Sequence, residues 1–128
     1  MSEPYWLTRE EYLALHDMML SFYGGVTGVR DQTLLDSALA KARQRYSYAT
    51  CDLPDLAAAY ATGVVKNHPF IDGNKRTGFM MAAGFLERNG LEFHAAEVDV
   101  VLRTLALAAG EMDEASYAGW LRANSKQA

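Results

Sequence analysis

Residues that start and stop helices divide the chain into segments, and apolar residues recur within each segment every three or four positions. Six segments of this kind predict helices over about residues 8–23, 31–45, 52–67, 74–89 and 96–109, and from residue 113 onward. Only residues 91–94 suggest a short extended piece. The pattern therefore predicts an all-α fold, a compact bundle of about six helices.

Polar residues mark the points where these helices begin. Thr8 is followed three residues later by Glu11, which is the spacing of a capping box. Asp31, Asp52 and Asp113 stand where a carboxylate can accept hydrogen bonds from the first backbone amides of a helix. Glycines are expected to end helices at Gly24, Gly90 and Gly110.

The helix over residues 74–89 carries apolar side chains around most of its circumference, so we expect it to be the buried central helix of the bundle. Residues 24–30 contain three glycines, but no Lys-Ser or Lys-Thr pair follows them, so a plain connector is predicted instead of a Walker loop. Residues 46–52 are predicted as a second connector. The polar tail from Ser125 is expected to fray.

Composition limits the class of protein. A chain of 128 residues, 50% apolar and 22% charged, predicts one globular domain over residues 1–128. The formal net charge of −4 argues against direct binding to nucleic acid. The single cysteine, Cys51, excludes an intramolecular disulfide and is expected to be structural. The N-terminus lacks the features of a signal peptide, and no apolar run reaches about 18 residues, so we expect a cytoplasmic protein without a membrane span.

The stretch from His68 to Phe79 holds the densest group of chemically capable side chains. A helix that begins near Asn74 leaves its first backbone amides unpaired and carries a partial positive charge. Gly73, just before it, has no side chain to keep a ligand away from the backbone. Together these features predict an anion site, best suited to phosphate.

The charged side chains of this stretch fit a phosphate site. Lys75 and Arg76 oppose the helix dipole in the first turn, and an anionic ligand would explain their position. Asp72 can give Mg²⁺ a hard oxygen ligand, and Asn74 can position a phosphate or a water molecule. His68 can accept a hydroxyl proton at neutral pH. Taken singly, the same residues also fit ordinary helix caps and solvated surface charges.

The nine residues H-P-F-I-D-G-N-K-R, His68 to Arg76, resemble the Fic signature H-x-F-x-(D/E)-(A/G)-N-(G/K)-R. The version with lysine before the arginine is similar to the Doc branch of the Fic/Doc family. Residues 15–17, 23–25 and 28–31 also look like Doc-type toxins. The resemblance implies that His68 is the catalytic base and Asp72 the Mg²⁺ ligand. It implies ATP and phosphate contacts for Lys66, Gly73, Asn74, Lys75 and Arg76.

Two positions differ from the adenylylating members of this family. Those enzymes usually carry glycine where Lys75 stands and a second arginine where Phe79 stands. Doc-type proteins share both departures, and they resemble kinases that pass the terminal phosphate of ATP to a threonine of translation elongation factor Tu. The resemblance therefore implies a toxin that is a protein Ser/Thr kinase and inhibits translation. Protein adenylylation is the nearest alternative.

The resemblance also implies a protein partner. Doc-type toxins pair with an antitoxin whose disordered C-terminal segment folds onto the toxin. A second hypothesis is therefore a binding module that acts mainly through its antitoxin to regulate transcription, and a housekeeping Fic-like enzyme is a third. The sequence leaves two residues open. His16 is either an ordinary helix-face histidine or a support for the site, and Arg30 has no assigned role.

Overall fold

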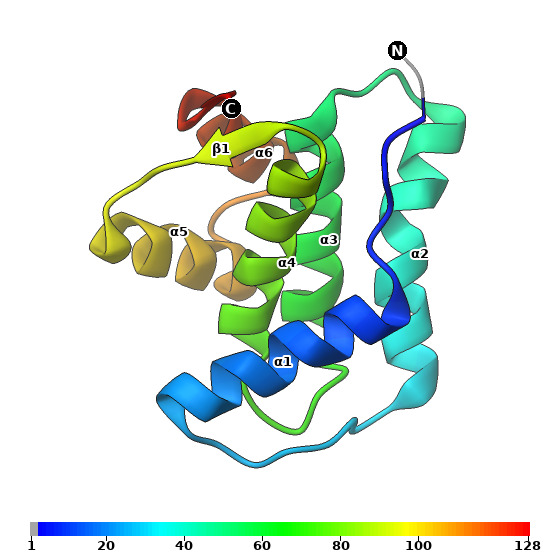
Figure 1. Ribbon diagram of the computed structural model, residues 1–128, viewed down its shortest axis with the longest axis vertical. Coiled ribbons are helices and arrows are strands. Elements are labelled where there is room, and N and C mark those ends of the chain that lie inside the picture. The colour runs from blue at the N-terminus through cyan, green and yellow to red at the C-terminus, as the bar shows by residue number, and fades with distance from the viewer. Residues whose placement is uncertain (1–2) are drawn as a thin grey trace.

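The computed structural model describes residues 3–128 and contains six α-helices and one two-stranded sheet, which confirms the all-α prediction (Figure 1). The helices are α1 (Arg9–Tyr23), α2 (Gln32–Tyr48), α3 (Leu53–Asn67), α4 (Asn74–Arg88), α5 (Glu97–Ala109) and α6 (Glu114–Ala123). The strands are β1 (Leu91–Phe93) and β2 (Ser125–Gln127).

The predicted capping residues start the helices. The Thr8 hydroxyl accepts a hydrogen bond from the Glu11 amide at 3.2 Å, and the Glu11 carboxylate accepts one from the Thr8 amide at 2.9 Å. Asp31, Asp52 and Asp113 each accept a bond from a first-turn amide of α2, α3 or α6. These side chains satisfy donors that the helices cannot pair internally.

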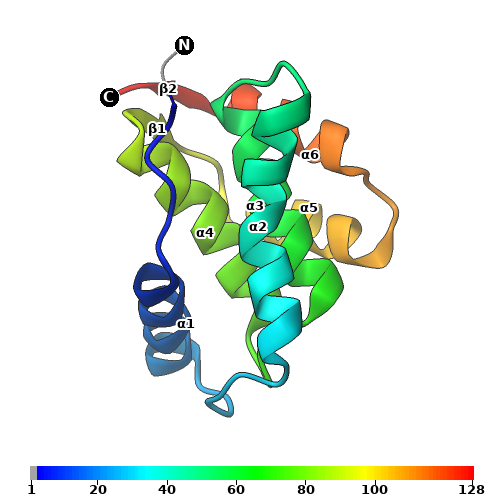
Figure 2. The same cartoon turned by 90° about the vertical axis from the view of Figure 1, so that its right-hand side faces the viewer.

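Helix α3 is the most deeply buried element, and α2, α4 and α6 pack around it (Figures 1 and 2). Its small residues allow close packing, because a Cβ atom added at Gly63 would lie 3.0 Å from the Cα atom of Ala38 on α2. The prediction that the helix over 74–89 is the central one was therefore wrong. The central helix is α3, which precedes it in the chain. Apolar residues of α4 such as Phe79 and Met80 are only half-buried, because they face a cleft instead of a helix.

Two other predictions were wrong. Helix α2 continues to Tyr48, three residues past the expected end at Arg45, so the connector to α3 is shorter than predicted. The tail does not fray at Ser125, because residues 125–127 form β2 and pair antiparallel with β1, with Leu91 opposite Gln127. Strand β1 offers unpaired backbone groups to this tail, and the polar composition of the tail did not reveal that partner.

Arg122 on α6 ties that helix to the start of α3. Its Nε and Nη2 atoms donate to the Asp52 carboxylate at 2.7 and 2.8 Å. These hydrogen bonds are the main reason that the pKa of Asp52 falls to about 2. Since the ordinary pKa of an aspartate is about 3.9, the stabilisation is fully present above about pH 4 and is lost as the pH falls towards 2.

We therefore predict that Asp52→Asn, which keeps a capping side chain, lowers the melting temperature by about 3 °C at pH 6, because the ion pair is exposed and modest. The difference from the unmodified protein should shrink as the pH falls from 4 to 2. Thermal unfolding followed by circular dichroism measures both values. A difference that stays constant down to pH 2 would contradict the assignment.

None of the helices within residues 3–128 is both long and apolar enough to cross a membrane.

Candidate functional site

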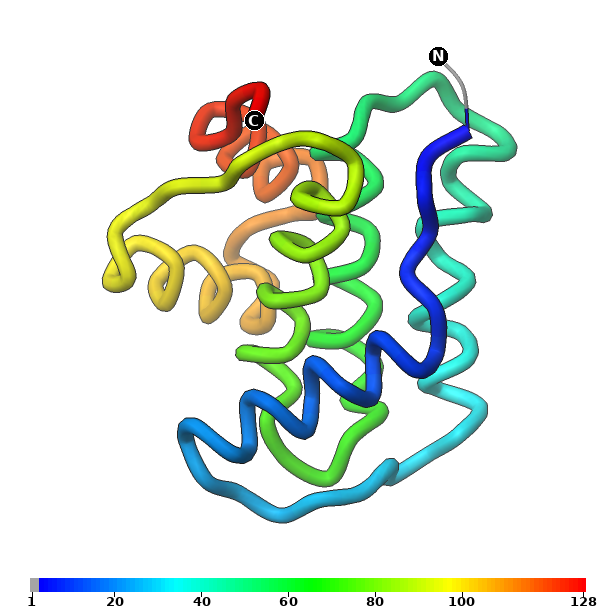
Figure 3. The backbone as a smooth tube through the Cα atoms, in the orientation of Figure 1, coloured from blue at the N-terminus to red at the C-terminus, as the bar shows by residue number. Residues whose placement is uncertain are grey.

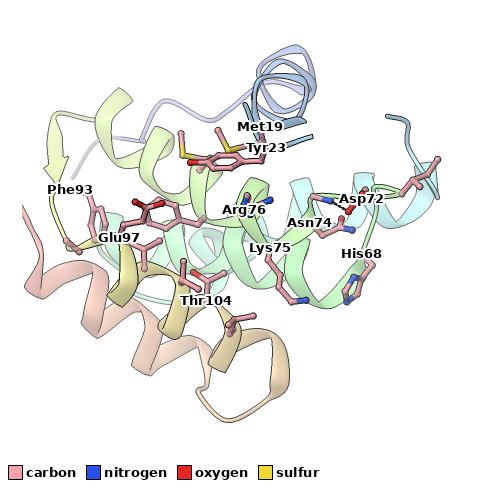
Figure 4. A pocket seen from close by; sticks show the side chains of 18 of the residues that line it. Met19, Tyr23, His68, Asp72, Asn74, Lys75, Arg76, Phe93, Glu97 and Thr104 are labelled. Atoms are coloured by element: carbon pink, nitrogen blue, oxygen red, sulfur yellow. Dashed lines mark hydrogen bonds between the residues drawn. The ribbon is translucent and has the colours of Figure 1, made fainter. Parts of the chain in front are cut away.

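A cleft of about 820 Å³ opens beside the first turns of α4 (Figure 4). One wall comes from the end of α1, and the opposite wall comes from α5 and the segment that joins it to β1. The loop between α3 and α4 and the first two turns of α4 line the remaining side. The structure places six of the predicted site residues in this lining, namely His68, Asp72, Gly73, Asn74, Lys75 and Arg76.

His68 ends α3 in an unusual backbone conformation. Its φ of 50° and ψ of 55° are left-handed, and within residues 3–128 it is the one residue other than glycine with a positive φ. Its amide still donates to the Val64 carbonyl at 3.1 Å, so it caps the helix. The imidazole is exposed and extends to the same side of α4 as Lys75 (Figure 4). A side chain in this position is free to meet a substrate hydroxyl.

Asn74 closes the loop between α3 and α4. Its Oδ1 atom accepts from the Phe70 amide at 3.0 Å, and its Nδ2 atom donates to the Phe70 carbonyl at 2.9 Å. Asn74 is buried, as is Phe70. The sequence predicted that Asn74 positions a phosphate or a water molecule. In the structure its side chain is instead hydrogen-bonded to the loop backbone, where it has a structural role.

The start of α4 has the features of an anion-binding site. Its N-cap, Gly73, has a φ of 75° and forms no side-chain capping bond, as is also true of Ala96 at the start of α5, whereas the N-cap side chains of α1, α2, α3 and α6 all form one. Lys75 and Arg76 in the first turn are exposed, and no carboxylate within residues 3–128 forms an ion pair with either. The Arg76 guanidinium lies over the Tyr23 ring at 4.2 Å, which holds it at the cleft. Free amides and two cations suit a phosphate.

Asp72 lies between this helix start and the glycine-rich loop over residues 24–30. Its Oδ1 atom accepts from the Gly73 amide at 2.9 Å, and its Oδ2 atom accepts from the Val26 amide at 3.3 Å. Gly25 permits this approach, because a Cβ atom there would lie 2.9 Å from Oδ2. Figure 3 shows residues 24–31 passing beside the loop between α3 and α4, and Val29 forms a backbone bridge with Phe70. The predicted connector is therefore hydrogen-bonded to the loop between α3 and α4, although most of its residues are exposed and none lines the cleft.

One exposed carboxylate fits a particular kind of metal binding. No group of three or more His, Cys, Asp or Glu side chains that could hold a metal occurs in the part of the chain that the structure describes. Mg²⁺ commonly takes one or two carboxylates and completes its shell with phosphate oxygens and water. Asp72 at the cleft, next to the helix start that the sequence predicts as a phosphate site, fits that donor set and not a cage built from protein ligands alone.

Lys66 is not brought together with the other predicted residues. Its Nζ atom lies 3.5 Å from the Ala108 carbonyl, near the end of α5, and it does not line the cleft. A cation is favourable there because the last carbonyls of a helix carry partial negative charge. Lys66 lies in the last turn of α3, and the chain changes direction after it at His68. The short spacing between the two residues therefore did not show that their side chains lie apart.

The structure also brings in two residues whose roles the sequence left open. His16 on α1 is buried, and its Nε2 atom lies 2.8 Å from the Asp72 carbonyl oxygen. Arg30 donates to the carbonyls of Asn67 and His68. Both lie in segments that resemble Doc-type sequences, and that resemblance was the available signal.

Comparison with known proteins shows the family of the chain. The sequence matches the Fic/DOC family over residues 6–86. The chain belongs to this family. It is 35% identical over 118 residues to the protein kinase doc of Escherichia phage P1, a match that covers 91% of this chain and 92% of the relative. It is 40% identical over 96 residues to the toxin Doc of Mycolicibacterium smegmatis, covering 70% of this chain and 72% of the relative.

Proposed function

We propose that the protein is the toxin of a toxin–antitoxin pair and acts as a protein Ser/Thr kinase. It would use ATP and Mg²⁺ to phosphorylate translation elongation factor Tu and so inhibit translation. The names of the two relatives, a protein kinase and a toxin, support the class. The observation that carries the proposal is the uncapped, doubly cationic start of α4 beside an exposed histidine in one cleft.

Each side chain has a defined part in this reaction. His68 would accept the proton of the target hydroxyl while that oxygen bonds to the terminal phosphorus, and the bond to the β-phosphate breaks to release ADP. Arg76, Lys75 and the first amides of α4, with Gly73 leaving the backbone open, would hold phosphate oxygens. Asp72 would hold Mg²⁺, which supplies charge neutralisation on the phosphates when bound.

The choice of phosphate transfer over adenylylation has support at Phe79. Adenylylating relatives carry a phosphate-binding arginine at the corresponding place. Here the Phe79 ring instead packs against Phe93 at 5.5 Å and lies 6.4 Å from Trp120, between ring centroids. The position is part of an aromatic cluster and offers no positive charge to a nucleotide. Label passing from the terminal phosphate of ATP to purified elongation factor Tu is the expected result of the direct test.

A second function, binding to a partner protein, is favoured by the surface of α5. Four apolar side chains, spaced along one face of this helix, are exposed by 45–67%, namely Val98, Val101, Leu102 and Leu105. A disordered antitoxin segment that folds on the toxin would cover apolar surface of this kind. The partner role is compatible with catalysis. The proposed target places the protein in the cytoplasm, and the net charge of −4 argues that any effect on transcription passes through the antitoxin.

A further inference from the structure

His16 holds the phosphate end of the loop between α3 and α4. Its side chain is 2% exposed, and its ring stacks on Phe70 with 3.8 Å between centroids and 8° between planes. A carbonyl oxygen can only accept, so the Nε2 atom donates its hydrogen to the Asp72 carbonyl at 2.8 Å. This bond fixes the peptide between Asp72 and Gly73. The orientation of that peptide sets the direction of the Asp72 carboxylate and of the first amides of α4.

Arg30 holds the other end of the same loop. Its Nε atom donates to the His68 carbonyl at 2.7 Å, and its Nη2 atom donates to the Asn67 carbonyl at 2.9 Å. The Arg30 amide also donates to the Pro69 carbonyl at 2.7 Å. These carbonyls stand at the end of α3, where a helix leaves them without internal partners. The paired bonds keep His68 in its left-handed conformation, which is costly for a residue other than glycine.

We infer that His16 and Arg30 are positioning residues of the reaction, with separate tasks. His16 orients the metal-binding and phosphate-binding end of the loop, and Arg30 orients the base. Neither side chain lines the cleft, so each acts through the loop backbone. The inference rests on the proposed function for the identity of the reaction, although the contacts themselves do not depend on it.

The separate tasks predict changes in different kinetic constants. His16→Phe keeps a stacking ring but removes the donor, and it should raise the KM for Mg-ATP about tenfold with a smaller change in kcat. His16→Gln restores an N–H donor and should recover most of the loss. The control is Tyr12→Leu, one turn earlier on α1, which removes a buried ring that packs on Tyr60 and whose hydroxyl forms no hydrogen bond to the loop.

For the base end, Arg30→Lys keeps the charge but loses the fork that spans two carbonyls. It should lower kcat about tenfold, and Arg30→Ala somewhat more, with little change in the KM for Mg-ATP. Arg9→Ala is the matched control, because Arg9 is also a surface arginine and pairs with Asp36 at 2.8 Å. It should leave both constants unchanged.

Amide NMR spectra give a readout that does not need activity. His16→Phe should shift the Gly73 amide resonance and speed its hydrogen exchange. Arg30→Ala should have the same effects on the amides of His68 and Phe70. The controls should leave these resonances in place. Loop amides and kinetic constants that respond equally to Tyr12→Leu and His16→Phe, or no recovery in His16→Gln, would overturn the His16 assignment. Equal effects of the Arg30 and Arg9 variants would overturn the assignment of Arg30 as a positioning residue. If the unmodified protein transfers no phosphate, the proposed function fails, while the spectra still decide whether these two residues fix the loop.

Discussion

Replacing His68 with alanine is expected to lower phosphate transfer by about 100- to 10,000-fold, which is the usual contribution of a general base. The fold should survive, because the imidazole is exposed and the residue contributes to the end of α3 through its backbone. Initial rates with a labelled acceptor measure the loss, and thermal unfolding checks the fold. Binding of Mg-ATP should change little, since the imidazole is proposed to meet the acceptor and not the phosphates.

His68→Asn is the control for backbone strain in this experiment. Asparagine tolerates the left-handed conformation better than alanine but cannot act as a base at neutral pH. It should be as inactive as the alanine variant and closer in stability to the unmodified protein. The decisive comparison is growth in a bacterial host without antitoxin. A His68→Ala protein that inhibits growth as strongly as the unmodified one would contradict catalysis as the source of toxicity and would favour the binding-module function.

Replacing Arg76 with alanine should lower kcat/KM for Mg-ATP by about 100-fold, the scale of removing one charged donor from a developing phosphate charge. The guanidinium has no carboxylate partner within residues 3–128, and Tyr23 holds it at the cleft. It can therefore turn both of its donor edges to phosphate oxygens. Isothermal titration with Mg-ATP should show weaker binding that accounts for part of the kinetic loss.

Two variants give this prediction its controls. Arg76→Lys keeps the charge but loses the paired donors, so only part of the activity should return. Arg88→Ala removes an exposed arginine from the last turn of the same helix, where it pairs with Glu11 away from the cleft. It should have almost no effect on kcat/KM. Equal losses for Arg76→Ala and Arg88→Ala would show that Arg76 is an ordinary surface charge.

The helical segments were predictable because their signals are local. Caps such as Thr8 and Asp52 act on amides only a few residues away, so the sequence shows them directly. The strand over residues 125–127 was missed because its partner lies more than thirty residues earlier in the chain. The central role of α3 was also missed. Apolar periodicity cannot tell whether a half-buried ring such as Phe79 faces a helix or a cleft.

The sequence predicted the residues of the motif at the candidate site, but not the contacts that segments distant in the chain make with it. The sequence shows that His68, Asp72 and Arg76 lie close together along the chain, and the structure places all three at one cleft. The sequence could not show that Lys66 faces the end of α5, because that depends on how two helices far apart in the chain pack together. For the same reason the contact of His16 with a loop 56 residues later became visible only in the structure.

The most direct test of the central claim is to incubate purified elongation factor Tu with the protein and Mg²⁺, using ATP labelled either on its terminal phosphate or on its α-phosphate. The kinase proposal predicts that label reaches the factor from the terminal phosphate, that none arrives from the α-phosphate, and that His68→Ala lowers the transfer by about 100- to 10,000-fold. Label arriving from the α-phosphate would contradict the proposal and establish adenylylation instead.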